Sequence, residues 1–145
     1  MAITQALANS FKKQLLDGDH SFATGTDVYK IALYTSSATL NSATTSYTTG
    51  NEVGNSGQYT AGGGALTGNN TSIASGVAIV DFADRSFTGV TLTARGALIY
   101  NTSSTATNAA VAALDFGADK TATSGTFTIQ FPAFTTSAAI LRISG

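Results

Sequence analysis

The sequence predicts a mainly β protein, a single antiparallel β-sandwich or barrel-like domain with one short N-terminal helix. Short runs rich in β-branched and aromatic residues recur along the chain, separated by Gly, Asn, Ser or Asp, which is the pattern of an all-β domain. Only one segment, close to the N-terminus, has the periodicity of an amphipathic helix. The length of 145 residues suits one domain, so we expect residues 1–145 to fold together.

The helix is predicted over residues 4–16, with Thr4 as its N-cap and Gly18 ending it. Apolar residues recur at every fourth position, as at Phe11 and Leu15. A helix this short is stable only when it docks on something. We expect its apolar stripe to pack on the protein's own sheet. Insertion into a neighbouring subunit is the alternative, which makes Phe11 and Leu15 candidate interface residues.

The first strand is expected at 28–34, and the segment that follows it has a different character. Residues 35–72 are rich in Gly, Thr and Asn and carry almost no charge. Loops this long in a compact domain are usually functional, so we interpret 35–72 as a loop or an interaction arm. Short edge strands are expected around Tyr47 and Tyr59, which are further candidate interface residues.

The strand signal is stronger after residue 72, and residues 73–145 are expected to form the core of the fold. Pro132, the only proline, falls at the end of a strand candidate, where a missing N–H costs little. The strand candidates are 77–82, 90–100, 110–116, 127–131 and 139–143.

The charge composition argues against several classes of partner. The chain has seven Lys and Arg residues and eight Asp and Glu residues. Charged residues make up 10% of the chain, compared with about 25% in an average soluble domain. No positive stripe is present, so we expect no binding to nucleic acid. No apolar run approaches the length of a membrane span, and Lys12 and Lys13 interrupt the only segment that could resemble a signal peptide. Weak charge also gives little protection against association, which suits a subunit surrounded by partners.

Residues suited to catalysis are scarce. The chain has one histidine, His20, one glutamate, Glu52, and no cysteine. His20 ends the sequence DGDH at 17–20, which comes directly after the predicted helix, and we expect it in an exposed turn. A triad needs a histidine beside a nucleophile, and general acid–base chemistry usually needs two carboxylates in different environments. We therefore expect no enzyme activity, no cofactor and no small-molecule substrate.

A few polar residues stand out as structural candidates. Arg95 interrupts a run that otherwise looks buried, and a buried arginine must be paired, with Asp81 or Asp115 as the obvious partner. The alternative is that Arg95 lies on the wet face of its strand. The aspartates lack the dense spacing of a calcium loop, so turn capping is favoured over a metal site. The glycines at 62–64 match no phosphate-binding motif, and are expected to relax a turn or to let another backbone approach.

Several segments resemble small virion structural proteins of tailed bacteriophages. They are KIALYTSSATL at 30–40, residues 47–63 with NEV and QYTAGG, TARGALIYN at 93–101 and LDFG at 114–117, and the NSFK of the helix adds to the likeness. The resemblance spans most of the chain. It brings no defined functional residues with it.

The resemblance implies a decoration (cement) protein bound to the outside of the head shell. Its partners would then be the major capsid protein and copies of itself, as a trimer, on the capsid surface of the virion. The chain would be made in the host cytoplasm without a signal peptide. A minor tail or head–tail component is the main alternative. A third is a receptor- or glycan-binding β-sandwich, with Tyr47, Tyr59 and the loops of 41–72 as its contact surface.

Overall fold

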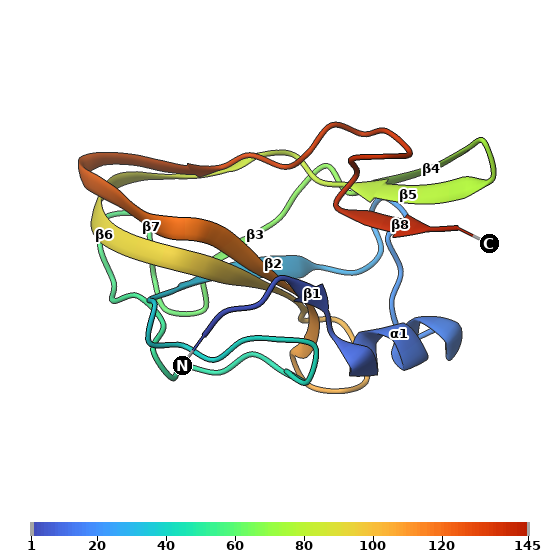
Figure 1. Ribbon diagram of the computed structural model, residues 1–145, viewed down its shortest axis with the longest axis horizontal. Helices are drawn as coiled ribbons and strands as arrows, with labels where there is room; N and C mark the ends of the chain where they lie inside the picture. The colour runs from blue at the N-terminus through green and yellow to red at the C-terminus, as the bar shows by residue number, and fades with distance from the viewer. Residues whose placement is uncertain (1, 145) are drawn as a thin grey trace.

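The strands of the computed structural model, which describes residues 2–144, pair antiparallel in two sheets, and there is one short helix near the N-terminus (Figure 1). The predicted fold class, a mainly β sandwich-like domain, is therefore confirmed. The elements are β1 (Ala6–Leu7), α1 (Asn9–Leu16), β2 (Tyr29–Tyr34), β3 (Gly64–Ala65), β4 (Asn70–Ala74), β5 (Val77–Asp81), β6 (Arg85–Asn101), β7 (Ala109–Ile129) and β8 (Leu141–Ile143).

The large sheet has the order β1-β7-β6-β2-β3, and the hairpin of β6 and β7 is its centre. The two strands pair along their whole length, from Arg85 opposite Ile129 to Asn101 opposite Ala109. Strand β2 lies between β3 and β6, and it pairs with β6 only along residues 96–101, all of which are buried. The first half of the hairpin is thus free to take part in the other layer of the fold.

The β6–β7 ribbon turns back on itself, as Figure 1 shows at the left. Phe116 and Phe127 belong to the same strand, and eleven residues of extended chain span roughly 36 Å at about 3.3 Å per residue. Their ring centroids are nevertheless only 6.1 Å apart. Several bulges produce this bend, and at the largest of them the four β7 residues 116–119 lie opposite Arg95 alone. Gly117 supplies a left-handed φ of 80° there.

The bulges correct one prediction about the strands. Residues 110–116 and 127–131 were expected to be separate strands, but 109–129 form one strand, because a bulge bends the chain without ending its ladder. Likewise, β6 begins at Arg85 rather than at residue 90, and β8 covers only Leu141–Ile143 of the expected 139–143.

The helix is shorter than predicted. It begins at Asn9, and Thr4 does not cap it, since Ala8 occupies the N-cap position. Ala6 and Leu7 instead pair with β7 as strand β1, and the Thr4 N–H donates to the carbonyl of Leu40. Pairing with a buried strand satisfies more backbone groups than another helical turn would, so tertiary contacts override the helical periodicity of this segment.

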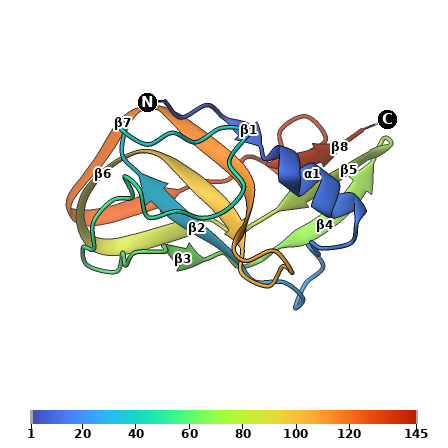
Figure 2. The same cartoon turned by 90° about the horizontal axis from the view of Figure 1, so that it is seen from below.

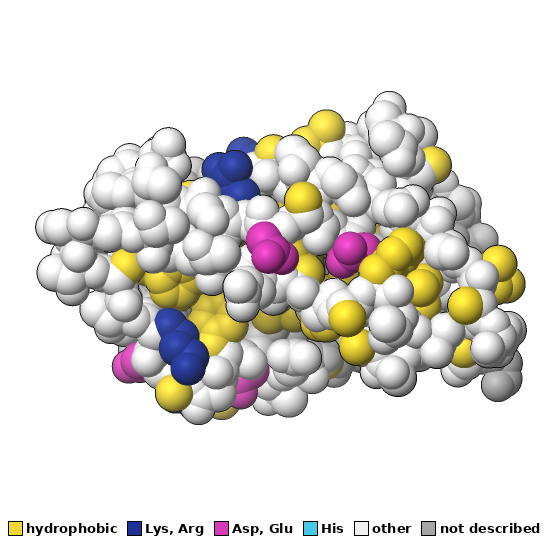
Figure 3. Space-filling view, turned by 90° about the horizontal axis from the view of Figure 1, so that it is seen from above, with side chains coloured by type: hydrophobic (Ala, Val, Ile, Leu, Met, Phe, Trp, Pro, Cys, Tyr) yellow, Lys and Arg dark blue, Asp and Glu magenta, His cyan; other side chains and the backbone are white. Residues whose placement is uncertain are grey.

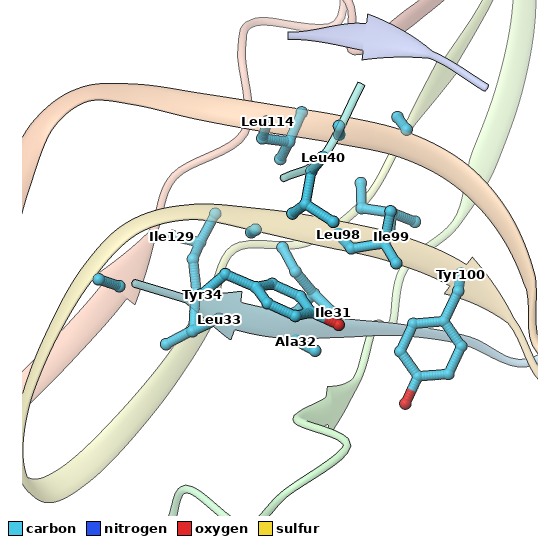
Figure 4. Packing of buried hydrophobic residues seen from close by; sticks show 14 of the residues in the cluster. Ile31, Ala32, Leu33, Tyr34, Leu40, Leu98, Ile99, Tyr100, Leu114 and Ile129 are labelled. Atoms are coloured by element: carbon cyan, nitrogen blue, oxygen red, sulfur yellow. The ribbon is translucent and has the colours of Figure 1, made fainter. Parts of the chain in front are cut away.

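Residues 35–66, expected from the sequence as a loop or an interaction arm, pack on the protein's own sheet. Leu40, Val53, Tyr59 and Leu66 are buried in this stretch. Figure 4 shows Leu40 within the cluster of buried residues that contains Leu98 and Tyr34. Apolar residues at wide intervals anchor the segment, and the uncharged residues between them form its turns.

The glycine run shows why this segment can lie so close to the sheet. A Cβ on Gly63 would lie only 1.7 Å from the carbonyl oxygen of Ile31, and the φ of Gly63 is +79°. The predicted close approach of another backbone at 62–64 is therefore confirmed, and Gly64 continues from it into β3 opposite Ile31.

The small sheet has the order β4-β5-β8 and lies at the end of the molecule that carries α1 (Figures 1 and 2). The two views together place α1 over one face of this sheet. Alternation along the paired strands puts mostly apolar residues on one face. These are Thr71, Ile73, Ala78, Val80, Leu141 and Ile143.

Candidate interaction surface

The two helical residues proposed from the sequence as interface residues differ in exposure. Phe11 is 2% exposed and packs on Phe22 with ring centroids 6.0 Å apart, so it belongs to the core and is not presented to a partner. Leu15 is half-buried against the same core. Leu16, which follows it, is 89% exposed. Neighbouring residues lie about 100° apart around a helix, so Leu16 widens the apolar stripe beside Leu15, and nothing in the sequence separates its exposed position from a buried one.

The two proposed tyrosines of the middle segment also point inward. Tyr59 is fully buried, and Tyr47 is half-buried, with its ring stacked on Tyr100 at a centroid distance of 4.8 Å. Both donate to Glu52, Tyr47 to Oε1 at 2.6 Å and Tyr59 to Oε2 at 2.7 Å. The N–H of Gly62 donates to the same Oε2 at 2.7 Å. The only glutamate of the chain thus holds the 35–66 segment together internally instead of facing a partner.

The surroundings of Glu52 raise the pKa of several tyrosines. Burial is the main cause for Tyr100, whose pKa is raised to about 12, and the carboxylate of Glu52 adds to the shift. Burial also raises the pKa of Tyr34, Tyr47 and Tyr59 well above the usual value, with Glu52 contributing in each case. All four phenols are therefore neutral donors at neutral pH. A glutamate isolated in an uncharged, tyrosine-containing segment is the sequence signal that could have revealed this cluster.

Arg95 forms its ion pair with Asp115 rather than with Asp81. The Nε of Arg95 lies 3.4 Å from Oδ1 of Asp115, and both side chains are partly exposed. Exposed pairs of this kind contribute at most about 1 kcal/mol. The same Asp115 oxygen accepts the N–H of Gly117 at 2.9 Å, so the pair lies across the largest bulge of the ribbon. Asp81 ends β5 in the other sheet.

His20 is buried, so its expected place in an exposed turn was wrong. Asn101 donates one amide proton to Nδ1 of His20 at 2.9 Å and the other to Asp27 at 2.8 Å. Nε2 of His20 lies 2.9 Å from Oε1 of Gln14 on α1. These partners fit a neutral ring with its proton on Nε2, and burial lowers the pKa of His20 in agreement. The ring ties α1 to the end of β6, a contact between distant parts of the sequence.

A groove separates α1 from the small sheet. We call it the α1 groove, and its volume is about 690 Å³. Its apolar lining includes Phe11, Leu15 and Leu16 from the helix side and Val80, Leu141 and Ile143 from the sheet.

Large aliphatic side chains are exposed around this groove. Besides Leu16, Ile73 is 72% and Ile143 is 59% exposed. Figure 3 shows the face of the molecule opposite to α1, where apolar atoms lie among uncharged polar ones and a few charged side chains. Large exposed aliphatic side chains beside an apolar groove mark sites of protein contact. The α1 groove and its rim are therefore the candidate interaction surface.

Residues 2–144 contain neither a candidate metal centre nor a membrane-spanning helix. In this range His, Asp and Glu side chains do not gather in a group of three or more able to hold a metal ion. No helix in the same range has the length and apolarity needed to cross a bilayer. Compared with known proteins, the chain matches no family model, no curated protein and no solved structure.

Proposed function

We propose that this chain is a structural protein of a tailed-bacteriophage virion, a decoration protein that binds the outside of the head shell and stabilises it. The observation that carries the proposal is the exposed apolar surface around the α1 groove, where Leu16, Ile73 and Ile143 are all open to solvent. A domain with few charges, an apolar groove and exposed aliphatic side chains beside it is suited to permanent contact with other subunits. The sequence resemblance supports the phage context.

The fold suits such a role mechanically. The long 35–66 segment is fastened to the sheet through Glu52 and through buried residues such as Leu40, so little of the chain is left as loose loop. A rigid subunit loses little conformational entropy on binding, so more of the free energy of burying apolar surface remains to hold neighbouring shell subunits together.

The proposal is tested with particles assembled with and without this chain. A decoration protein is expected in hundreds of copies per particle, and particles lacking it should release their DNA at lower temperature and after milder osmotic shock. Quantitative mass spectrometry gives the copy number, and dye access to DNA during heating gives the stability. Equal resistance of both kinds of particle would refute the stabilising role, and a few copies per particle would assign the chain to the tail or the head–tail junction.

A further inference from the structure

The outer edge of β8 is open, and two cavities adjoin the strand. One is the α1 groove, and the other is a cavity of about 420 Å³ lined by β8, Val77 and Ile140 among others. Both cavities are lined by Leu141 and Arg142 of β8 and by Leu7 of β1. β8 is therefore an edge strand with unfilled space beside it.

The backbone of that edge is unpaired. β8 pairs only with β5, and its remaining backbone groups make no hydrogen bond with any other residue in 2–144. An open edge strand beside an apolar groove accepts an extended segment, because the added strand satisfies the free N–H and C=O groups and its side chains fill the groove.

The charges around the groove define the chemistry of its occupant. Lys12 and Arg142 are the charged residues that line it, and neither Asp nor Glu is among its lining residues. Within the described chain, neither cation forms a salt bridge. Lys12 donates to Oδ1 of Asn9 at 3.3 Å, and Arg142 donates to the carbonyl of Ser137 at 2.9 Å. Carboxylate side chains on the bound segment would give Lys12 and Arg142 ion-pair partners.

We infer that β8 and the α1 groove bind an extended, apolar segment of the shell protein that carries carboxylate side chains. This inference rests on the proposed function and adds to it the binding edge and the partner's chemistry. The added strand pairs with β8, its apolar side chains enter between Leu16 and Ile143, and its carboxylates meet Lys12 and Arg142.

Binding to shells that lack this chain tests the inference, with co-sedimentation as the readout. Leu16→Asp places a charge in the groove, and Arg142→Glu reverses one of its cations. Each should weaken binding about tenfold or more, as expected for a central interface residue. The matched controls lie outside the groove: Val28→Asp changes another exposed apolar residue, and Lys120→Glu another exposed cation, and both should stay within about twofold of the wild type. Thermal unfolding of all four variants checks that they are folded.

Salt provides a second measurement on the same variants. Raising NaCl from about 50 mM to about 500 mM screens exposed charge pairs. It should therefore weaken the binding of the wild-type protein to shells more than the binding of the Arg142→Glu variant. An equal salt response of the two would overturn the carboxylate part of the inference.

The remaining outcomes separate the inference from the function beneath it. If the wild type binds shells and Leu16→Asp binds as tightly as Val28→Asp, the groove inference is wrong while the decoration role stands. If the wild type does not bind shells, the decoration role fails and the inference falls with it. Native mass spectrometry of the free protein tests whether something other than the shell protein occupies the groove. A dimer abolished by Leu16→Asp would assign the groove to a second copy, and a bound small amphiphile lost in that variant would assign it to a lipid-like ligand, and each result would overturn the shell-protein segment.

Discussion

Tyr59 links the backbone of β2 to the only glutamate of the chain: its hydroxyl accepts the N–H of Leu33 at 2.7 Å and donates to Oε2 of Glu52 at 2.7 Å. Through this relay a carboxylate in the 35–66 segment is fastened to a central strand of the large sheet. The same carboxylate accepts the N–H of Gly62, the first residue of the glycine run that lies against β2. Three hydrogen bonds of the segment thus meet at one side chain.

Replacing Glu52 by Gln should destabilise the fold by about 1–3 kcal/mol. The side-chain NH₂ of Gln cannot accept a hydrogen bond, so at either oxygen position it would face the donors that Glu52 now binds. Urea unfolding followed by circular dichroism measures the loss. Asp119→Asn is the matched control, since Asp119 is exposed and should change stability by less than about 0.5 kcal/mol. Equal effects of the two substitutions would show that the Glu52 hydrogen bonds contribute little.

Alkaline pH should unfold the protein through its tyrosines. The pKa of Tyr100 is about 12 in the folded protein, against about 10 in an unfolded chain, so the folded state holds the proton more tightly. Stability from this group is complete below pH 10 and is lost as the pH rises from 10 through 12. Tyr29 and Tyr59 shift in the same direction because they are buried. Absorbance at about 295 nm, which follows phenolate formation, should therefore rise together with loss of the β-sheet signal, and gradual ionisation of an intact fold would contradict this.

Mild acid should weaken the contact between α1 and the rest of the domain. Burial lowers the pKa of His20 below its usual value near 6.5, so the unfolded chain takes up the proton first. The contribution of His20 is complete above pH 6.5 and is lost as the pH falls through the lower folded pKa. A proton on Nδ1 would also oppose the Asn101 amide that donates to it. Thermal unfolding between pH 5 and pH 8 should show this loss, and His20→Gln should remove that part of the pH dependence; an unchanged profile in the variant would assign it to other groups.

Gly63→Ala should be strongly destabilising, by more than about 2 kcal/mol, because its Cβ would overlap the Ile31 carbonyl and its φ is left-handed. Gly54→Ala is the matched control. A Cβ there meets nothing within 4 Å, so the substitution should be neutral or slightly stabilising. Chemical unfolding midpoints of both variants check the prediction, which fails if Gly63→Ala is as stable as Gly54→Ala.

Local patterns in the sequence were enough to predict the antiparallel all-β class, the position of β2 and the need for glycine at 62–64. These features depend on alternation, on residues that break strands and on conformations open to glycine, all of which act over a few neighbouring residues. Arg95 was recognised as a residue needing a partner, but two aspartates fitted equally well, because the choice depends on which strand lies beside β6.

Contacts between distant segments decided everything else. Ala6 and Leu7 form a strand because they pair with Ala112 and Ala113 of β7. His20 is buried because folding brings it against Asn101, which is 81 residues away in the sequence. The α1 groove follows from the same cause, since α1 and β8 come from opposite ends of the sequence and only folding brings their apolar faces near each other. Periodicity along a chain reveals which side of an element is apolar, whereas the free energy of packing in three dimensions determines what that side meets.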